Sequence, residues 1–231
     1  MTTATSVKIS KKTLELLKNF ASINSNILVK PGNTIKTISN YKNVLAEAEV
    51  TEDFEMEFGI WDLNKLLGTV SLFEDPSFEF HDKHMVISGE NGAKVTYYYS
   101  EPKLLTTITK DLVMPDVAVS CEIGEDDFKE IQRAASVLQL PDLKISSDGD
   151  DIVLTVHDRK DPSSNDYSFS VGKNSDGADF NFYFKVENMK MLPGEYSVDI
   201  CKNSVARFSN NNLDLKYWVA MEPDSNYTGG S

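Results

Sequence analysis

The chain has 231 residues and a formal net charge of −13 at pH 7. This length allows one large domain or two ordinary ones, and a bulk negative charge argues against binding a polyanion unless the basic residues are gathered locally. No stretch approaches the ~20 apolar residues that a membrane-spanning helix needs, and the N-terminal residues lack the apolar run of a signal peptide. We therefore expect a soluble, intracellular protein.

An amphipathic helix is expected at residues 11–24, after a short alternating strand. Ser10 is a residue type that accepts the free N–H groups of a first helical turn. Apolar residues recur every three or four positions and define the face that we expect to be buried: Leu14, Leu16, Leu17, Phe20 and Ala21. Lys12 and Glu15 lie on the opposite face, and a β-rich stretch follows.

The rest of the first half alternates like antiparallel strands, interrupted by one more helix. Asp62 is expected to cap that helix at residues 62–73, with Lys65 on its polar side. Glu90-Asn91-Gly92 is expected to form a hairpin turn. The strands that we predict are at 33–50, 55–61, 78–80, 85–88 and 93–100.

The opening pattern returns 114 positions later, which indicates an internal duplication. Phe128, Ile131 and Ala135 occupy the places of Leu14, Leu17 and Ala21 in a second helix at 125–140. Strands and a fourth helix then repeat the plan, and the end of the chain reads as a flexible tail. The predicted elements are strands at 142–146, 152–157, 167–171, 179–186, 196–201, 205–208 and 215–221, a helix at 187–192 and a tail at 223–231.

We therefore predict an α+β protein of two duplicated domains, each with two helices packed on antiparallel sheets. The stretch 101–116 has a proline near each end and no clean period, so it is expected to connect them. The predicted boundaries are residues 1–100, 101–116 and 117–231.

Charge is distributed unevenly between the helices and the remainder of the chain. The four predicted helices hold seven basic and seven acidic residues, so the remainder carries the whole excess of −13. Most of the helical acids are in first turns, where they complement the helix dipole, which leaves the later turns mildly basic. Solvation of ordinary polar faces explains these lysines as well as a binding role does.

The residues give no sign of a metal, a cofactor or a catalytic centre. Cys121 and Cys201 lie far apart in the chain without metal-ligand spacing, so neither a disulfide nor a metal site is expected. None of the histidines (His81, His84 and His157) accompanies a plausible nucleophile in the sequence. An enzyme with paired carboxylates and a structural or scaffold protein of duplicated β-rich domains remain as alternatives.

Four segments resemble a known family: LLKNFASINSNILVK, WDLNKLLGTVSLF, VENMKMLPGEYSV and YWVAMEPDS. They look like the sliding clamp, the DNA polymerase processivity factor, of T-even-type bacteriophages. The ending LKYWVAMEPD is also similar to the tail of proliferating cell nuclear antigen. The resemblance covers nearly the whole chain and is weakest at 34–50 and 101–117.

The resemblance implies a homotrimer that closes into a ring around duplex DNA without reading its sequence, in the cytoplasm of an infected bacterium. It implies binding to the DNA polymerase, the clamp loader and late-transcription factors. The DNA-facing candidates are Lys11, Lys12, Lys18, Lys65, Lys129, Arg133 and Lys190. The candidates for a groove that binds partner peptides are Leu112, Val113, Met114, Met221, Glu222 and Pro223; a plug between domains is the alternative role for the first three. Those for the subunit interface are Lys94, Thr96, Tyr98, Tyr167, Phe169 and Val171.

Overall fold

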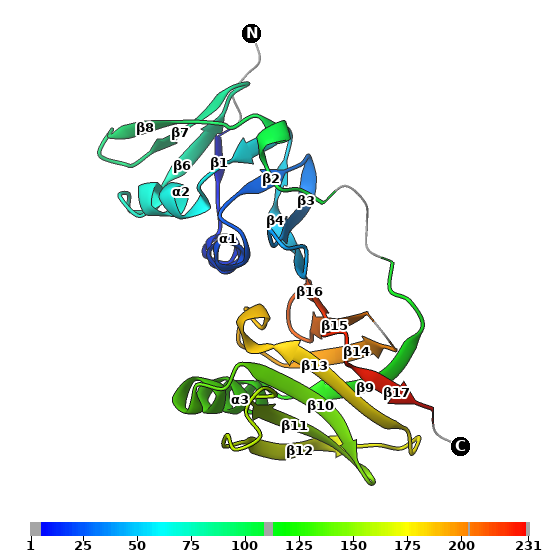
Figure 1. Cartoon of the computed structure of the whole chain (residues 1–231). Helices are drawn as coiled ribbons and strands as arrows, with labels where there is room; N and C mark the ends of the chain where they lie inside the picture. Colours follow the sequence, from blue (N-terminus) through cyan, green and yellow to red (C-terminus); the bar gives the residue numbers. More distant parts are fainter. Residues whose placement is uncertain (1–5, 109–112, 203, 230–231) are drawn as a thin grey trace. The chain divides into compact units, whose positions relative to one another are not determined.

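The computed structural model describes residues 6–108, 113–202 and 204–229. The chain divides into two compact units, Met1–Lys110 and Asp111–Ser231 (Figure 1). Each unit combines antiparallel strands with α-helix, which confirms the predicted α+β class.

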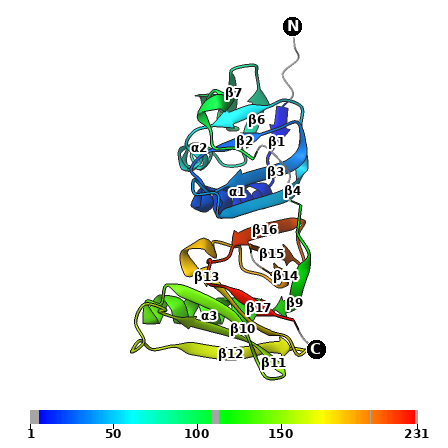
Figure 2. The same cartoon turned by 45° about the vertical axis from the view of Figure 1, so that its right-hand side comes forward.

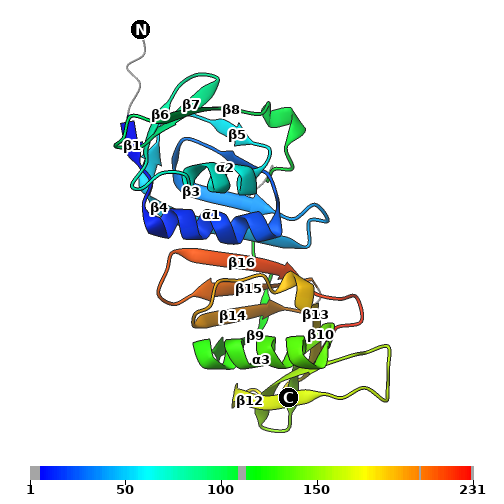
Figure 3. The same cartoon turned by 90° about the vertical axis from the view of Figure 1, so that its left-hand side faces the viewer.

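In the first unit, two helices lie side by side against β-structure (Figure 3). One sheet has the strand order β1-β6-β7-β8, while β2 pairs with β5 and β3 with β4, all antiparallel. The elements are β1 (Ser6–Lys8), α1 (Lys11–Ile23), β2 (Ile27–Val29), β3 (Gly32–Ile38), β4 (Val44–Phe54), β5 (Phe58–Ile60), α2 (Leu63–Val70), β6 (Ser77–Phe80), β7 (His84–Ser88), β8 (Lys94–Tyr98) and the 3-10 turn η1 (Pro102–Leu104).

The second unit has one sheet in the order β9-β14-β15-β16 and another in the order β12-β11-β10-β13-β17 (Figure 2). Helix α3 packs against β11 and β12. The elements are β9 (Val117–Ile123), α3 (Glu125–Leu138), β10 (Asp142–Asp148), β11 (Asp151–His157), β12 (Tyr167–Lys173), β13 (Asp179–Lys185), the 3-10 turn η2 (Val186–Asn188), β14 (Tyr196–Cys201), β15 (Val205–Asn210), β16 (Leu215–Ala220) and β17 (Asn226–Thr228).

The sheet orders confirm the internal duplication. In each unit the strand before the first helix pairs with the first of three consecutive strands near the end of the unit, giving β1-β6-β7-β8 and β9-β14-β15-β16. Val7 lies opposite Phe78 in the first pairing, and Cys121 lies opposite Val198 in the second. The repeated sequence therefore folds into a repeated topology.

The predicted fourth helix is wrong. Residues 186–188 form a single 3-10 turn, so the described part of the second unit has α3 as its one α-helix. Pro193 disfavours helical backbone at Leu192. The Leu192 backbone instead bonds two buried tyrosines: Tyr196 donates to its carbonyl at 2.5 Å, and its N–H donates to the Tyr217 hydroxyl at 3.2 Å.

The predicted flexible tail is also wrong where it is described. Residues 226–228 form β17, which pairs with the otherwise open side of β13. Tyr227 stacks on Phe182, with ring centroids 6.5 Å apart. An exposed strand edge readily accepts another strand, and the hydrophobic side chain of Tyr227 gains burial there.

The first part of the predicted connector is packed onto the first unit. Leu105 is buried, and the Thr106 N–H donates to Asn26 Oδ1 at 3.1 Å. A Cβ added at Gly59 would lie 2.6 Å from Leu105 Cδ1 and 2.7 Å from the Ser100 carbonyl oxygen, so glycine is required for this close approach. The boundaries 101–116 stay a prediction, because residues 109–112 lie outside the described chain.

Candidate functional site

Helix α1 carries three lysines and one glutamate. Ser10 caps it as predicted, accepting a hydrogen bond from the Thr13 N–H at 3.1 Å. Its apolar face is buried at Leu16, Leu17 and Phe20. The three lysines of the predicted DNA-facing set are all exposed: Lys11, Lys12 and Lys18.

A buried carboxylate on β4 holds the first turn of α1. Glu52 accepts hydrogen bonds from the backbone N–H of Ser10 and the hydroxyl of Thr13. Burial by itself would raise the pKa of Glu52, but these hydrogen bonds outweigh it and bring the pKa below its ordinary value of 4.5. The charged carboxylate complements the positive end of the helix dipole.

Lys65 and Lys190 lie in different local structures, although their sequences align. Asp62 caps α2 by accepting the Lys65 N–H at 2.9 Å, and the Lys65 side chain is exposed. Lys190 is exposed but follows the 3-10 turn η2, so its predicted position on a helix is wrong. Because the Lys190 side chain is exposed, its DNA-facing role remains a proposal.

Helix α3 buries Phe128, Ile131 and Ala135 as predicted and exposes Lys129 and Arg133. Unlike α1 it is acidic, because it carries four carboxylates, three of them in its first turn. Lys129 Nζ pairs with Glu125 at 2.5 Å, and this hydrogen bond raises the pKa of Lys129. Across the described chain, no ion pair involves Lys11, Lys12, Lys18, Lys65 or Arg133.

The residues predicted for the subunit interface lie on two sheet edges. β8 ends the first sheet of unit 1, and β12 ends the second sheet of unit 2. Lys94, Thr96 and Tyr98 alternate along β8 and are exposed, with Tyr98 reaching 72%. The side chains predicted on β12 are partly exposed: Tyr167, Phe169 and Val171.

An open groove of about 670 Å³ runs between α3 and Tyr167, at the edge of β12. Val137 and Leu138 line it and are exposed, at 72% and 37%. Tyr167 donates a hydrogen bond to Glu130 across the groove. The groove thus places an uncovered apolar surface directly beside an unpaired strand edge.

The two segments predicted to form the partner groove contact the end of β14 and the residue before β15. The Cys201 thiol donates to the Pro115 carbonyl at 3.5 Å, next to Met114, and the Met221 N–H donates to the Ser204 carbonyl at 3.0 Å. Val113 is 83% exposed, whereas Met221 is buried at 9%. Glu222 is partly exposed and Pro223 exposed, while Leu112 lies outside the described residues.

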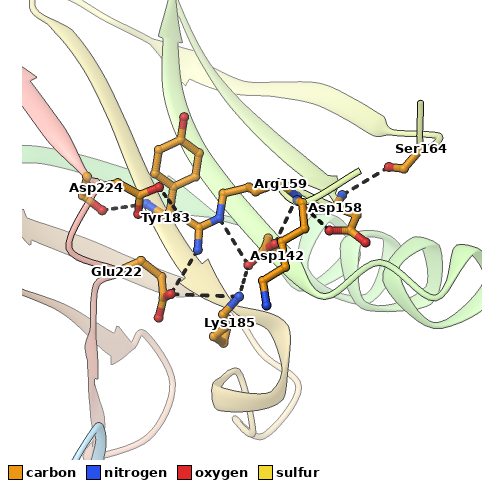
Figure 4. A network of polar contacts seen from close by, with 10 residues as sticks. Asp142, Asp158, Arg159, Ser164, Tyr183, Lys185, Glu222 and Asp224 are labelled. Carbon is orange, nitrogen blue, oxygen red and sulfur yellow. Dashed lines mark hydrogen bonds and ion pairs between the residues drawn. The ribbon is translucent and has the colours of Figure 1, made fainter. Parts of the chain in front are cut away.

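A polar network joins the chain after β16 to β10, to β13 and to the loop between β11 and β12 (Figure 4). Asp142 on β10 is 1% exposed and accepts from Lys185 Nζ at 2.5 Å and from the Arg159 N–H at 3.2 Å. Arg159 also bonds Glu222 at 3.0 Å and Asp224 at 2.5 Å. Burial would raise the pKa of Asp142, but the two cations hold it below its ordinary range.

Sequence reasoning missed both Glu52 and Arg159. Glu52 is an acid at a buried position of an alternating strand. This exception to the alternation is the one feature of the sequence that indicates a special role for Glu52. Arg159 lies in a turn that matches no motif, and its partners are 17 to 65 residues away. Such contacts follow from the packed fold and not from local spacing.

Metal and membrane sites find no support in the part of the chain that the structure describes. No group of three or more histidine, cysteine, aspartate or glutamate side chains is placed there to hold a metal ion. None of the helices in residues 6–108, 113–202 and 204–229 combines the length and the apolarity needed to cross a bilayer.

Two family models match consecutive parts of the chain. The model described as "DNA polymerase processivity factor" matches residues 8–114, and the one described as "gp45 sliding clamp, C terminal" matches residues 120–223. The sliding clamp of Enterobacteria phage T4 is 30% identical over 231 residues, covering 96% of this chain and 99% of the relative. The sliding clamp of Vibrio phage KVP40 is 28% identical over 221 residues, with coverages of 94% and 99%.

The fold is shared with solved structures of much lower identity. The proliferating cell nuclear antigen of A. fulgidus, solved with the C-terminal region of FEN-1 bound, superposes with a TM-score of 0.69 at 11% identity. The superposition covers 94% of this chain and 97% of that one.

Proposed function

The chain belongs to the family of phage sliding clamps, and we propose that three copies of it close into a ring around duplex DNA. As a member of this family it is a DNA polymerase processivity factor, a protein that keeps the polymerase tethered to its template. The family is one of non-catalytic scaffolds, and the proposal assigns no chemistry to this chain. Its place of action is the cytoplasm of an infected bacterium.

The observation that carries the DNA-facing assignment is the exposed lysine face of α1 in a chain of net charge −13. A ring that encloses DNA needs no base readout, only weak attraction between mobile cations and phosphates. The lysines of α1 have no carboxylate partner among the described residues, so their charge is available to phosphates. Lys65, Lys129, Arg133 and Lys190 complete the proposed inner surface.

Ring closure is proposed through the edges of β8 and β12. Backbone N–H and C=O groups at an unpaired strand edge readily bond another strand. In this arrangement β8 of one copy pairs with β12 of the next, and the groove beside β12 receives apolar side chains of the same neighbour. Such a contact covers Val137 and Leu138, which are exposed in the single chain.

Partner binding is proposed at the exposed residues of the connector and the segment after β16. Val113 and Met114 offer an apolar, adaptable surface for a short peptide. The A. fulgidus relative, with which this chain shares its fold, was solved with a peptide region of another protein bound. The polymerase, the clamp loader and late-transcription factors are the partners that we assign to this surface.

Sedimentation tests the proposal against the scaffold alternative. We expect a species of about three times 25.8 kDa, whereas a scaffold protein would form large assemblies. With the clamp loader present, the trimer should lengthen the products of the cognate polymerase on a primed circular template, because a ring cannot slide off an end there. A monomer without any effect on product length would contradict the proposed function.

A further inference from the structure

The segment Glu222–Ser225 is held against β13 by one backbone hydrogen bond and by the Ser225 hydroxyl. The Glu222 N–H donates to the Tyr183 carbonyl at 2.8 Å, and the Tyr183 N–H donates to Ser225 Oγ at 3.0 Å. β17 continues this pairing along β13. The backbone immediately after Met221 is therefore fixed by β13. The position of this backbone determines the direction in which the Pro223 side chain points.

One side chain from outside this strand pair, that of Arg159, adds ion pairs to the segment. The Arg159 guanidinium reaches Glu222 at 3.0 Å and Asp224 at 2.5 Å, and its centre lies 4.8 Å from the centroid of the Tyr183 ring. Its side chain is 17% exposed. A planar guanidinium can bond two carboxylates through its edge while its face stacks on an aromatic ring, whereas an ammonium group has no planar face to stack.

The charges in this network make Arg159 difficult to replace. Three carboxylates, those of Asp142, Glu222 and Asp224, share the two cations Arg159 and Lys185. Lys185 is occupied by Asp142 at 2.5 Å and lies 3.9 Å from Glu222. Without Arg159, the carboxylates of Glu222 and Asp224 would repel one another, and the Lys185 ammonium would offset this repulsion only weakly.

The loop that carries Arg159 is itself tied down. Asp158 accepts from the Lys160 N–H at 2.8 Å, its own N–H donates to Ser164 Oγ at 3.3 Å, and Asp161 accepts from the Ser163 N–H at 2.9 Å. Figure 4 shows the loop and the tail segment approaching from opposite sides of Tyr183 and Lys185. The loop that carries the Arg159 guanidinium is thus held in place by its own hydrogen bonds.

We propose that Arg159 is a positioning residue for partner binding: it fixes Glu222 and Asp224 on β13 and so sets the peptide-binding conformation of the segment after β16. The inference rests on the proposed function, because it assumes that this segment borders the partner groove. Arg159 acts through the tail and does not itself touch the peptide. Loss of its contacts should reduce the fraction of molecules with a competent tail, and the apparent affinity falls in proportion to that fraction.

The test uses the full chain and a synthetic peptide with the C-terminal residues of the cognate DNA polymerase. We expect Arg159→Ala to weaken peptide binding about tenfold in calorimetric titration, with Arg159→Lys in between. Amide hydrogen exchange should speed up at residues 222–228 and stay unchanged on β6 and β7. The Asp224 side chain is 63% exposed, so we expect Asp224→Asn to fold normally. This variant should weaken binding about threefold and show the same local exchange pattern.

Arg207→Ala is the matched control, because it removes a half-buried ion pair, that with Asp199 at 2.5 Å, which involves neither Glu222 nor Asp224. It should leave peptide affinity unchanged. Wild-type affinity and exchange in both Arg159→Ala and Asp224→Asn would overturn this inference alone, as would faster exchange throughout the unit. A wild-type chain that does not bind the peptide would overturn the groove assignment and this inference with it.

Discussion

The hydroxyl of Thr13 lies 2.5 Å from Glu52 Oε2, which joins the first turn of α1 to β4 through two side chains that are 1% and 7% exposed. This contact ties the most lysine-rich helix to the first unit's β-structure. Hydrogen bonds to a buried charged group contribute about 1.5–3 kcal/mol each, and an unpaired buried partner costs a similar amount.

Replacing Glu52 should therefore change stability in a pH-dependent way. We expect Glu52→Gln to lower the free energy of unfolding by about 1–2 kcal/mol at pH 7. The folded pKa is below 4.5, so the carboxylate's contribution is present above the unfolded pKa and is lost as the pH falls through the folded value. Urea unfolding at pH 7 and at acidic pH should show the two proteins converging. Glu49→Gln, an exposed change on the same strand, serves as control.

Charge reversal on α1 should shorten processive synthesis without unfolding the protein. Lys12 and Lys18 are exposed and form no ion pair in the described chain, so Lys12→Glu with Lys18→Glu removes two of the proposed phosphate contacts at no packing cost. Product length on a primed template should fall about threefold to tenfold, and raising the salt should affect this variant less than the wild type. The exposed Lys83→Glu is the control; equal losses in both variants would refute a specific role for α1.

A proline at Tyr98 should block trimer formation. The Tyr99 N–H donates to the Lys83 carbonyl on the inner side of β8 at 3.1 Å, so the Tyr98 N–H points toward the open edge. Tyr98→Pro removes that donor while sparing the bonds to β7. Light scattering should give monomers. Tyr98→Ala keeps the backbone donor and separates its effect from that of the side chain; a trimeric proline variant would contradict pairing at this edge.

Val113 is the residue best suited to a test of the proposed partner groove, because its side chain is exposed. Met221 is buried, so Met221→Asp would place a charge in the core and destabilise the unit. Val113→Asp changes an 83% exposed side chain and should weaken binding of the polymerase's C-terminal peptide about tenfold, or 1.4 kcal/mol. Tyr41→Asp changes a 91% exposed aromatic elsewhere and should have no effect on binding. Unchanged affinity of Val113→Asp would place the groove elsewhere.

The sequence alone determined the elements whose signals are local. The helices α1, α2 and α3 were predicted because their apolar periodicity, and the capping side chains of Ser10 and Asp62, involve residues within one or two turns. The duplication was visible for the same reason, since each copy repeats the spacing of its buried side chains. These patterns and the family resemblance together predict the α+β clamp fold.

Only the tertiary structure decided the elements that depend on distant partners. Residues 187–192 have a helical pattern, but buried Tyr196 and Tyr217 satisfy the Leu192 backbone instead. The segment after Pro223 is polar and reads as a tail, yet the open edge of β13 pairs with it. The contacts of Glu52 and Arg159 bridge 17 to 65 residues. Burial gives these contacts their strength, because a low local dielectric favours paired charges and penalises unpaired ones.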